Sequence, residues 1–285
     1  MTPKKLWPLS ALTLLLTACP ATTVPAPTPV NGVSGTVIEV KSSNPTLTTG
    51  PWTGGAGRVD GFMDIAPLTS HQTEVVTTGA LAASGDFTLS MPTTVPTTAL
   101  MPFNPETVVL TGLFVSLTNG EATCTGTPTF STRSAQQSSL RLGAIGTVSG
   151  EMRPQLLTET QTTQTTAQGE VIKTSSVLQE GALVYFDAPV TLNGTVTCSG
   201  PVALAPSGTV TGKVVFNAKF VKGWNKANIT LDQNAVVTTT SSTVNADITL
   251  NITLTAGSLP TDKWTVVSPI PTSQGVKAPR SFFMR

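Results

Sequence analysis

Residues 247–255 alternate between polar and apolar side chains without interruption. The apolar members, Ile248, Leu250, Ile252 and Leu254, occupy every second position, which is the period of a β-strand with one buried face. This pattern is typical of antiparallel strands whose other face meets water. We therefore expect these four side chains to face a core and their neighbours to face solvent.

Shorter strand-like stretches recur along the rest of the chain. They cover residues 33–40, 87–91, 107–117, 140–152, 184–186, 190–198, 209–220 and 264–267. Threonine and valine, which favour strands, are common in them, whereas 24 glycines and 22 prolines interrupt the chain often. No helical stripe is seen outside the first nineteen residues. The sequence predicts an all-β fold of antiparallel β-sandwich modules.

The connections between these strands are predicted from their composition. Residues 49–61 are glycine-rich and 131–139 are rich in Ser and Gln, so we expect loops there. Asn193–Gly194 is a favoured hairpin dipeptide. Residues 158–168 are almost purely Thr, Gln and Glu, which fits either an exposed hairpin tip or a disordered loop.

The chain begins with the pattern of an export signal. Lys4 and Lys5 precede an apolar run over residues 6–16, which is too short to cross a bilayer, and Leu16-Thr17-Ala18-Cys19 follows. This segment resembles the signal of bacterial lipoproteins, and residues 16–19 fit the lipobox of that family. The resemblance implies cleavage before Cys19 and acylation of that cysteine. The alternative is an ordinary signal peptide that contains a cysteine.

The mature chain would be tethered and nearly neutral. Removing residues 1–18 from the 285 leaves 267, with 14 basic and 15 acidic residues, so nothing favours nucleic-acid binding. Residues 19–32 carry prolines at 20, 25, 27 and 29 and predict an extended tether. Proline rather than aspartate follows Cys19, and this favours the outer membrane over the inner one. We expect a cell-envelope protein held to membrane lipid through acylated Cys19.

Residues 33–92 resemble a known small β-module. The stretch Val33-Ser34-Gly35-Thr36-Val37 and the later Gly85-Asp86-Phe87-Thr88-Leu89-Ser90-Met91-Pro92 are similar to the carboxypeptidase-regulatory-like, transthyretin-like β-sandwich. That resemblance implies a spacer or adhesion domain with no catalytic residues. It places a first domain at 33–104 and a second β-rich domain at 105–285, although the loop near 130 offers another boundary.

Two cysteines remain in the mature chain, Cys124 and Cys198. An exported chain meets an oxidising environment, so we predict that they form a disulfide, with two buried thiols as the alternative. The closed loop would stabilise the fold by about 4 kcal/mol in the chain-entropy model.

Catalytic and metal-binding residues are sparse. The single histidine, His71, lies beside Ser70 in a loop-like stretch, which indicates a solvated side chain rather than a triad. Asp60 and Asp64 lack the spacing of a calcium loop, so we interpret them as turn residues. We expect no metal, no cofactor and no enzymatic activity. A carboxylate-dependent glycan hydrolase is the weakest alternative, because nothing in the sequence selects a pair of acids.

Trp52 and Trp224 are the candidate ligand-binding residues, because each lies within two residues of a glycine in an apparent loop. As a stacking platform they would bind cell-wall glycan. The competing interpretation is that both tryptophans cap a β-core. The leading hypothesis is a lipid-anchored envelope protein with a structural or interaction role and an envelope protein as partner. The alternative is a lipoprotein that binds carbohydrate or peptidoglycan.

Overall fold

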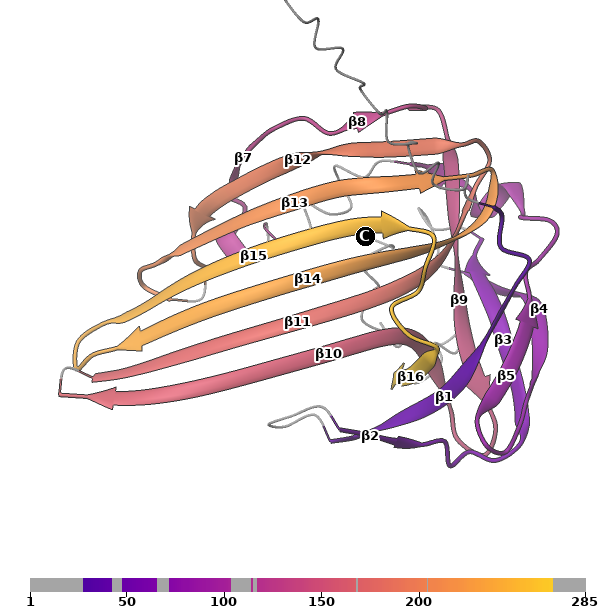
Figure 1. The fold of residues 1–285 in the computed structure, drawn as a ribbon, viewed down its shortest axis with the longest axis horizontal. Coiled ribbons are helices and arrows are strands. Elements are labelled where there is room, and N and C mark those ends of the chain that lie inside the picture. Colours follow the sequence, from indigo (N-terminus) through magenta and orange to yellow (C-terminus); the bar gives the residue numbers. More distant parts are fainter. Residues whose placement is uncertain are drawn as a thin grey trace, which may run out of the picture.

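A computed structural model describes residues 28–42, 48–65, 72–103, 114, 117–167, 169–203 and 205–268. The fold is all-β, as predicted, and its strands join into one sheet (Figure 1). The strands of the first half are β1 (Gly32–Ser42), β2 (Thr48–Pro51), β3 (Gly57–Asp64), β4 (Thr73–Leu81), β5 (Asp86–Ser90), β6 (Met101–Pro102), β7 (Thr123–Thr125) and β8 (Thr129–Phe130). The strands of the second half are β9 (Gln136–Ile145), β10 (Ser149–Thr166), β11 (Gly169–Phe186), β12 (Val190–Pro201), β13 (Thr209–Phe220), β14 (Gly223–Thr239), β15 (Val244–Ala256) and β16 (Lys263–Ser268). A short 3-10 helix spans Thr97–Ala99.

Seven strands close into a ring, which we call the strand ring. The hydrogen-bonded order is β9, β3, β4, β5, β1, β16 and β10, and β10 pairs back with β9. Apolar side chains that point to the same side of these strands form one buried cluster. That cluster includes Val33, Val37, Val59, Leu81, Phe87, Leu89, Leu142, Ala144, Met152 and Trp264. Closure removes free strand edges from most of this part of the molecule.

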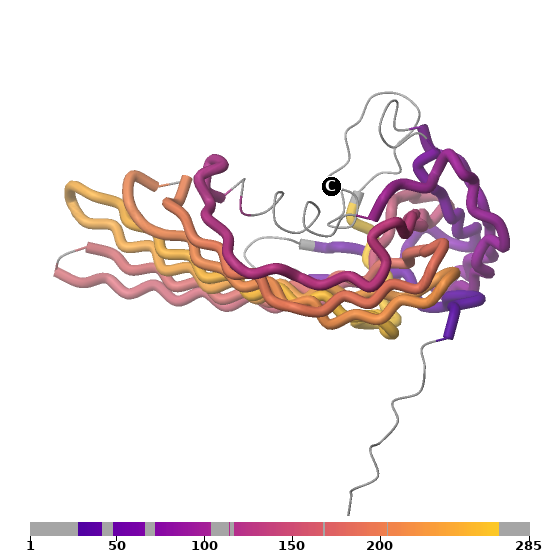
Figure 2. Tube along the Cα trace, turned by 90° about the horizontal axis from the view of Figure 1, so that it is seen from above, coloured from indigo at the N-terminus to yellow at the C-terminus, as the bar shows by residue number. Residues whose placement is uncertain are grey.

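Six strands form a second unit, the long sheet, in the order β10, β11, β14, β15, β13 and β12. These strands are long, and the β11–β14 pairing runs from Glu170 opposite Thr239 to Phe186 opposite Gly223. Figure 2 shows them extending as one layer away from the strand ring. One face is apolar and forms the second core cluster. Its buried members include Val210, Val214, Phe216, Ile229, Ile248, Leu250, Ile252 and Leu254.

The predicted alternation of β15 is confirmed. Ile248, Leu250, Ile252 and Leu254 are buried, and the residues between them are exposed or half-buried. The opposite face of the long sheet is polar in consequence, with rows such as Thr211, Thr249 and Asn234 running across neighbouring strands. Two strand pairs nevertheless run parallel, β13–β15 and β1–β16, so the sheet is mixed rather than purely antiparallel.

The ring and the long sheet share strands. β9 pairs with β3 and β10 in the ring and with β11 in the long sheet, and β10 pairs with β16, β9 and β11. Pairing therefore crosses residue 104, the boundary predicted from sequence. Residues 104–113 lie outside the described residues, and the two-domain division stays a prediction.

Three local predictions differ from the structure. Residues 49–61 form β2 and the start of β3 rather than one loop, and the second half of 131–139 belongs to β9. Asn193 and Gly194 lie inside β12 instead of forming a turn. Gly194 has a φ of 128°, and a Cβ there would lie 3.0 Å from the Cα atom of Pro128. Glycine at this position therefore lets the segment around Pro128 approach β12 closely.

Two other predicted segments have different outcomes. Of the Thr/Gln-rich stretch, residues 158–166 form the outer end of β10 in the β10–β11 hairpin, which agrees with the first of the two predicted forms. The strand expected at 107–117 lies largely outside the described residues.

Candidate functional site

Among the described residues, several buried or half-buried charged side chains gather where the strand ring meets the long sheet. Asp64 ends β3, Arg141 lies on β9, Glu151 and Arg153 lie on β10, and Glu180 lies on β11. We call these five residues the junction cluster. Arg141 and Arg153 stand on adjacent strands, because Leu142 is the partner of Met152 in the β9–β10 register. Four strands thus bring their charges to one place.

Glu151 is the centre of the junction cluster. Its side chain is 2% exposed, and both carboxylate oxygens accept hydrogen bonds from arginine. Arg141 donates from Nε to Oε1 at 3.3 Å and from Nη2 to Oε2, while Arg153 donates from Nη2 to Oε1 at 3.3 Å. Such bidentate, charge-assisted bonds fix the guanidinium orientation.

Two further carboxylates complete the cluster. Arg141 Nη1 lies 3.7 Å from Asp64 Oδ1, and Arg153 Nη1 lies 3.5 Å from Glu180 Oε1. The guanidinium of Arg141 also lies 5.1 Å from the centroid of the Phe62 ring, a cation–π contact. Arg141 therefore links β3 to β10 within the ring, and Arg153 links β10 to β11 of the long sheet.

The chemistry of this cluster favours a structural role. A glycan hydrolase needs two carboxyl groups directed at a substrate across a cleft. Here Glu151 and Glu180 both turn to Arg153, and both oxygens of Glu151 are engaged by guanidinium groups. Within the described ranges, no three His, Cys, Asp or Glu side chains are grouped to hold a metal ion.

Asp60 is not the solvated turn residue expected from sequence. It lies in β3, is buried, and accepts bonds from Arg58 Nε at 3.0 Å and from Thr78 Oγ1 at 3.0 Å. Asp64 is four residues further along the same strand and contacts Arg141. The two acids therefore serve separate ion pairs on β3. His71 lies outside the described residues.

Trp52 and Trp224 are both buried, at 5% exposure each. Trp52 Nε1 donates to the carbonyl of Gly55 at 2.7 Å, and Trp224 Nε1 donates to the carbonyl of Pro92 at 2.9 Å. The Trp224 ring also meets Tyr185 edge-on, with centroids 5.5 Å apart. Stacking on a sugar requires an exposed ring face, and these indoles instead pack in the ring core cluster.

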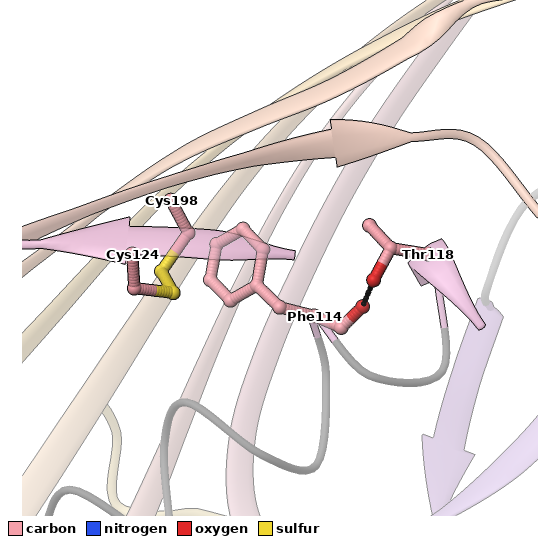
Figure 3. Close-up of a disulfide and its surroundings, with 4 residues drawn as sticks. All are labelled: Phe114, Thr118, Cys124 and Cys198. Carbon is pink, nitrogen blue, oxygen red and sulfur yellow. Dashed lines mark hydrogen bonds between the residues drawn. A yellow bond between two sulfur atoms is a disulfide. The ribbon is translucent and has the colours of Figure 1, made fainter. Parts of the chain in front are cut away.

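Cys124 and Cys198 form a disulfide, as predicted (Figure 3). Cys124 lies on β7 and Cys198 on β12, where the two residues are direct antiparallel partners with Cα atoms 4.1 Å apart. Cys198 is 1% exposed and belongs to the apolar cluster of the long sheet. The bond joins residues 74 apart in sequence and fastens β7 to the outer side of β12.

The start of the described chain is held at one end of the molecule. The Val30 N–H donates to the carbonyl of Trp224 at 2.9 Å, and the Met91 N–H donates to the carbonyl of Asn31 at 2.9 Å. β14 runs from this end over 17 residues to Thr239, a length of about 55 Å at the usual rise per residue. Cys19 lies outside the described residues.

No family model matches the chain, and no curated protein or solved structure matches it. The resemblances to lipoprotein signals and to the transthyretin-like module therefore stay predictions from sequence. Among the described residues, no helix is long and apolar enough to cross a membrane.

Proposed function

We propose that this chain is an exported, lipid-anchored protein of the bacterial cell envelope with a structural or interaction role. The lipobox-like residues 16–19 supply the anchor at Cys19, and the proline-rich residues 20–29 supply the tether. Two acyl chains or more on one residue suffice for stable anchoring. Proline after Cys19 favours the outer membrane over the inner one.

The observation that carries this proposal is the Cys124–Cys198 disulfide. Disulfides persist outside the cytoplasm and are rare within it. Together with the export signal, the bond supports folding on the extracytoplasmic side. The signal and the disulfide are independent of one another, because the signal is a local sequence pattern and the disulfide depends on the pairing of strands distant in sequence.

The shape of the long sheet supports display of a surface to a partner. The tether enters beside Trp224, whereas the turns that join β10 to β11 and β14 to β15 lie at the far ends of their strands. A chain anchored at its amino terminus would thus present these turns about 55 Å from the entry point. Exposed Thr, Asn and Ser side chains line the polar face between the two ends.

Metabolic labelling with radioactive palmitate tests the anchor. The parent chain and a Cys124→Ser variant should both incorporate label, whereas Cys19→Ala should incorporate none. Cys124→Ser is the matched control, since it also removes one cysteine but leaves the lipobox intact. Equal labelling of the Cys19→Ala variant and the parent would disprove lipid attachment at this residue.

A further inference from the structure

The two edge strands of the long sheet differ in whether other strands cover them. At one edge, β12 pairs with β7 and β8, and the Cys124–Cys198 disulfide fastens β7 in place. Figure 2, which looks down on this edge, shows the covering segment running along it. Short covering strands of this kind protect a sheet edge from pairing with another chain.

The opposite edge is formed by β10 and has no such cover. β16 pairs with β10 only as far as Pro154, and residues beyond it pair with β11 on one side. Among the described residues, no strand pairs with the other side of residues 155–165, which we call the β10 edge. Every side chain from Leu156 to Thr165 is exposed.

The β10 edge lacks the devices that usually prevent strand addition. Exposed edges are commonly interrupted by lysine, proline, a bulge or a very short strand. Residues 155–165 contain no lysine and no proline, and their register with β11 is unbroken. Leu156 and Leu157, at 43% and 38% exposure, stand at its base as exposed apolar residues.

A second copy of the same edge is a complementary partner. Glu159 is the only ionisable residue within it, and the others are Thr, Gln and Leu. In an antiparallel pair centred on Gln161, Thr160 faces Thr162 and Glu159 faces Thr163. The two Glu159 carboxylates are then never opposite one another, and Thr–Thr and Gln–Gln pairs are favourable across strands.

We propose that two copies of this chain join through their β10 edges, in an antiparallel pair centred on Gln161, to form one continuous sheet. Outward N–H and C=O groups of alternate residues in each edge bond to the other copy. The proposal does not depend on the lipid anchor, because the edge lies beyond the tether and would pair equally in an unacylated chain.

Cysteine trapping tests this geometry in the full-length chain produced with its own signal sequence. Paired residues in antiparallel strands have Cα atoms about 4.5–5.5 Å apart, within reach of a disulfide. Gln161→Cys should therefore give a band of twice the chain mass on a non-reducing gel, which reduction removes. Thr249→Cys, exposed on the interior strand β15, should stay at single mass. A Gln161→Cys chain that remains at single mass overturns the proposal.

A charge variant provides the second measurement, by sedimentation of the purified mature chain. Gln161→Glu places two carboxylates opposite one another at the centre of the pair and should raise the dimer dissociation constant about tenfold or more. Thr249→Glu is the matched control: Thr249 is exposed and lies two residues from Asp247, as Gln161 lies two from Glu159. A monomeric parent, or a dimer that both variants weaken equally, overturns the proposal.

Discussion

Removing the negative charge of Glu151 should destabilise the fold strongly, because this carboxylate is the most buried of the three in the junction cluster. Glu151→Gln keeps the shape of the side chain but replaces one acceptor oxygen by an NH2 group, which is a donor. Arg141 and Arg153, each 15% exposed, would then lose their shared carboxylate. Breaking a buried pair by removing one partner costs about 3–5 kcal/mol.

The remaining contacts place the expected loss at the lower end of that range. Asp64 still lies 3.7 Å from Arg141, and Glu180 still lies 3.5 Å from Arg153. We therefore expect a loss of about 3 kcal/mol, or roughly a hundredfold in the unfolding equilibrium. Because β9 and β10 belong to both units, the loss should appear in the whole unfolding transition rather than in one part.

Urea unfolding monitored by tryptophan fluorescence provides the measurement. Trp52, Trp224 and Trp264 are all buried, so unfolding should expose all three. Glu170→Gln is the control: it makes the same change at an exposed position on the neighbouring strand β11 and should stay within about 0.5 kcal/mol of the parent. If Glu151→Gln is as stable as Glu170→Gln, the junction cluster does not hold the ring to the sheet.

Three further predictions concern single sites. Replacing Cys124 and Cys198 together by alanine should cost about 4 kcal/mol of unfolding free energy relative to the disulfide-bonded parent, measured by urea titration without reductant, because the closed loop spans 74 residues. Gly212→Ala should cost about 1–3 kcal/mol by the same titration, since the added methyl group would overlap the buried Phe114 ring; unchanged stability would contradict this packing. Hydrogen bonds from the Thr209 hydroxyl, then from the Asn245 amide and the Thr209 N–H, lower the pKa of Asp247 below its ordinary 3.8. The ionised Asp247 carboxylate therefore stabilises the folded state above pH 3.8, and this stabilisation is lost as the pH falls below that value. In Asp247→Asn, the unfolding free energy should fall less steeply than in the parent between about pH 5 and about pH 3.

The strands that pack on one face were predictable because their pattern is local. β15 alternates through Ile248 to Leu254, and the burial follows that period. β1, β5 and β16 likewise match the stretches 33–40, 87–91 and 264–267 closely. In these segments the same alternation of residues predicts both that a strand forms and which of its faces is buried.

The closed ring and the junction cluster could not be predicted, because both depend on which strands become neighbours. Arg141, Glu151 and Glu180 are scattered in sequence, and only the β9–β10–β11 pairing brings them together. For Trp52 and Trp224 the sequence left two interpretations open, a ligand-binding platform and a cap on a β-core, and their burial agrees with the second. A glycine close to a tryptophan is typical of an exposed loop, whereas in the structure the glycine two residues after Trp52 leaves room for the indole to fold back over it.

Mass spectrometry of the mature amino-terminal peptide tests the central claim most directly. Membranes from cells that produce the full chain would be extracted and the tether peptide isolated after proteolysis. We predict a peptide that begins at Cys19 and carries acyl chains on that residue. A peptide that retains Met1–Ala18, or one that begins at another residue without lipid, would contradict lipid anchoring.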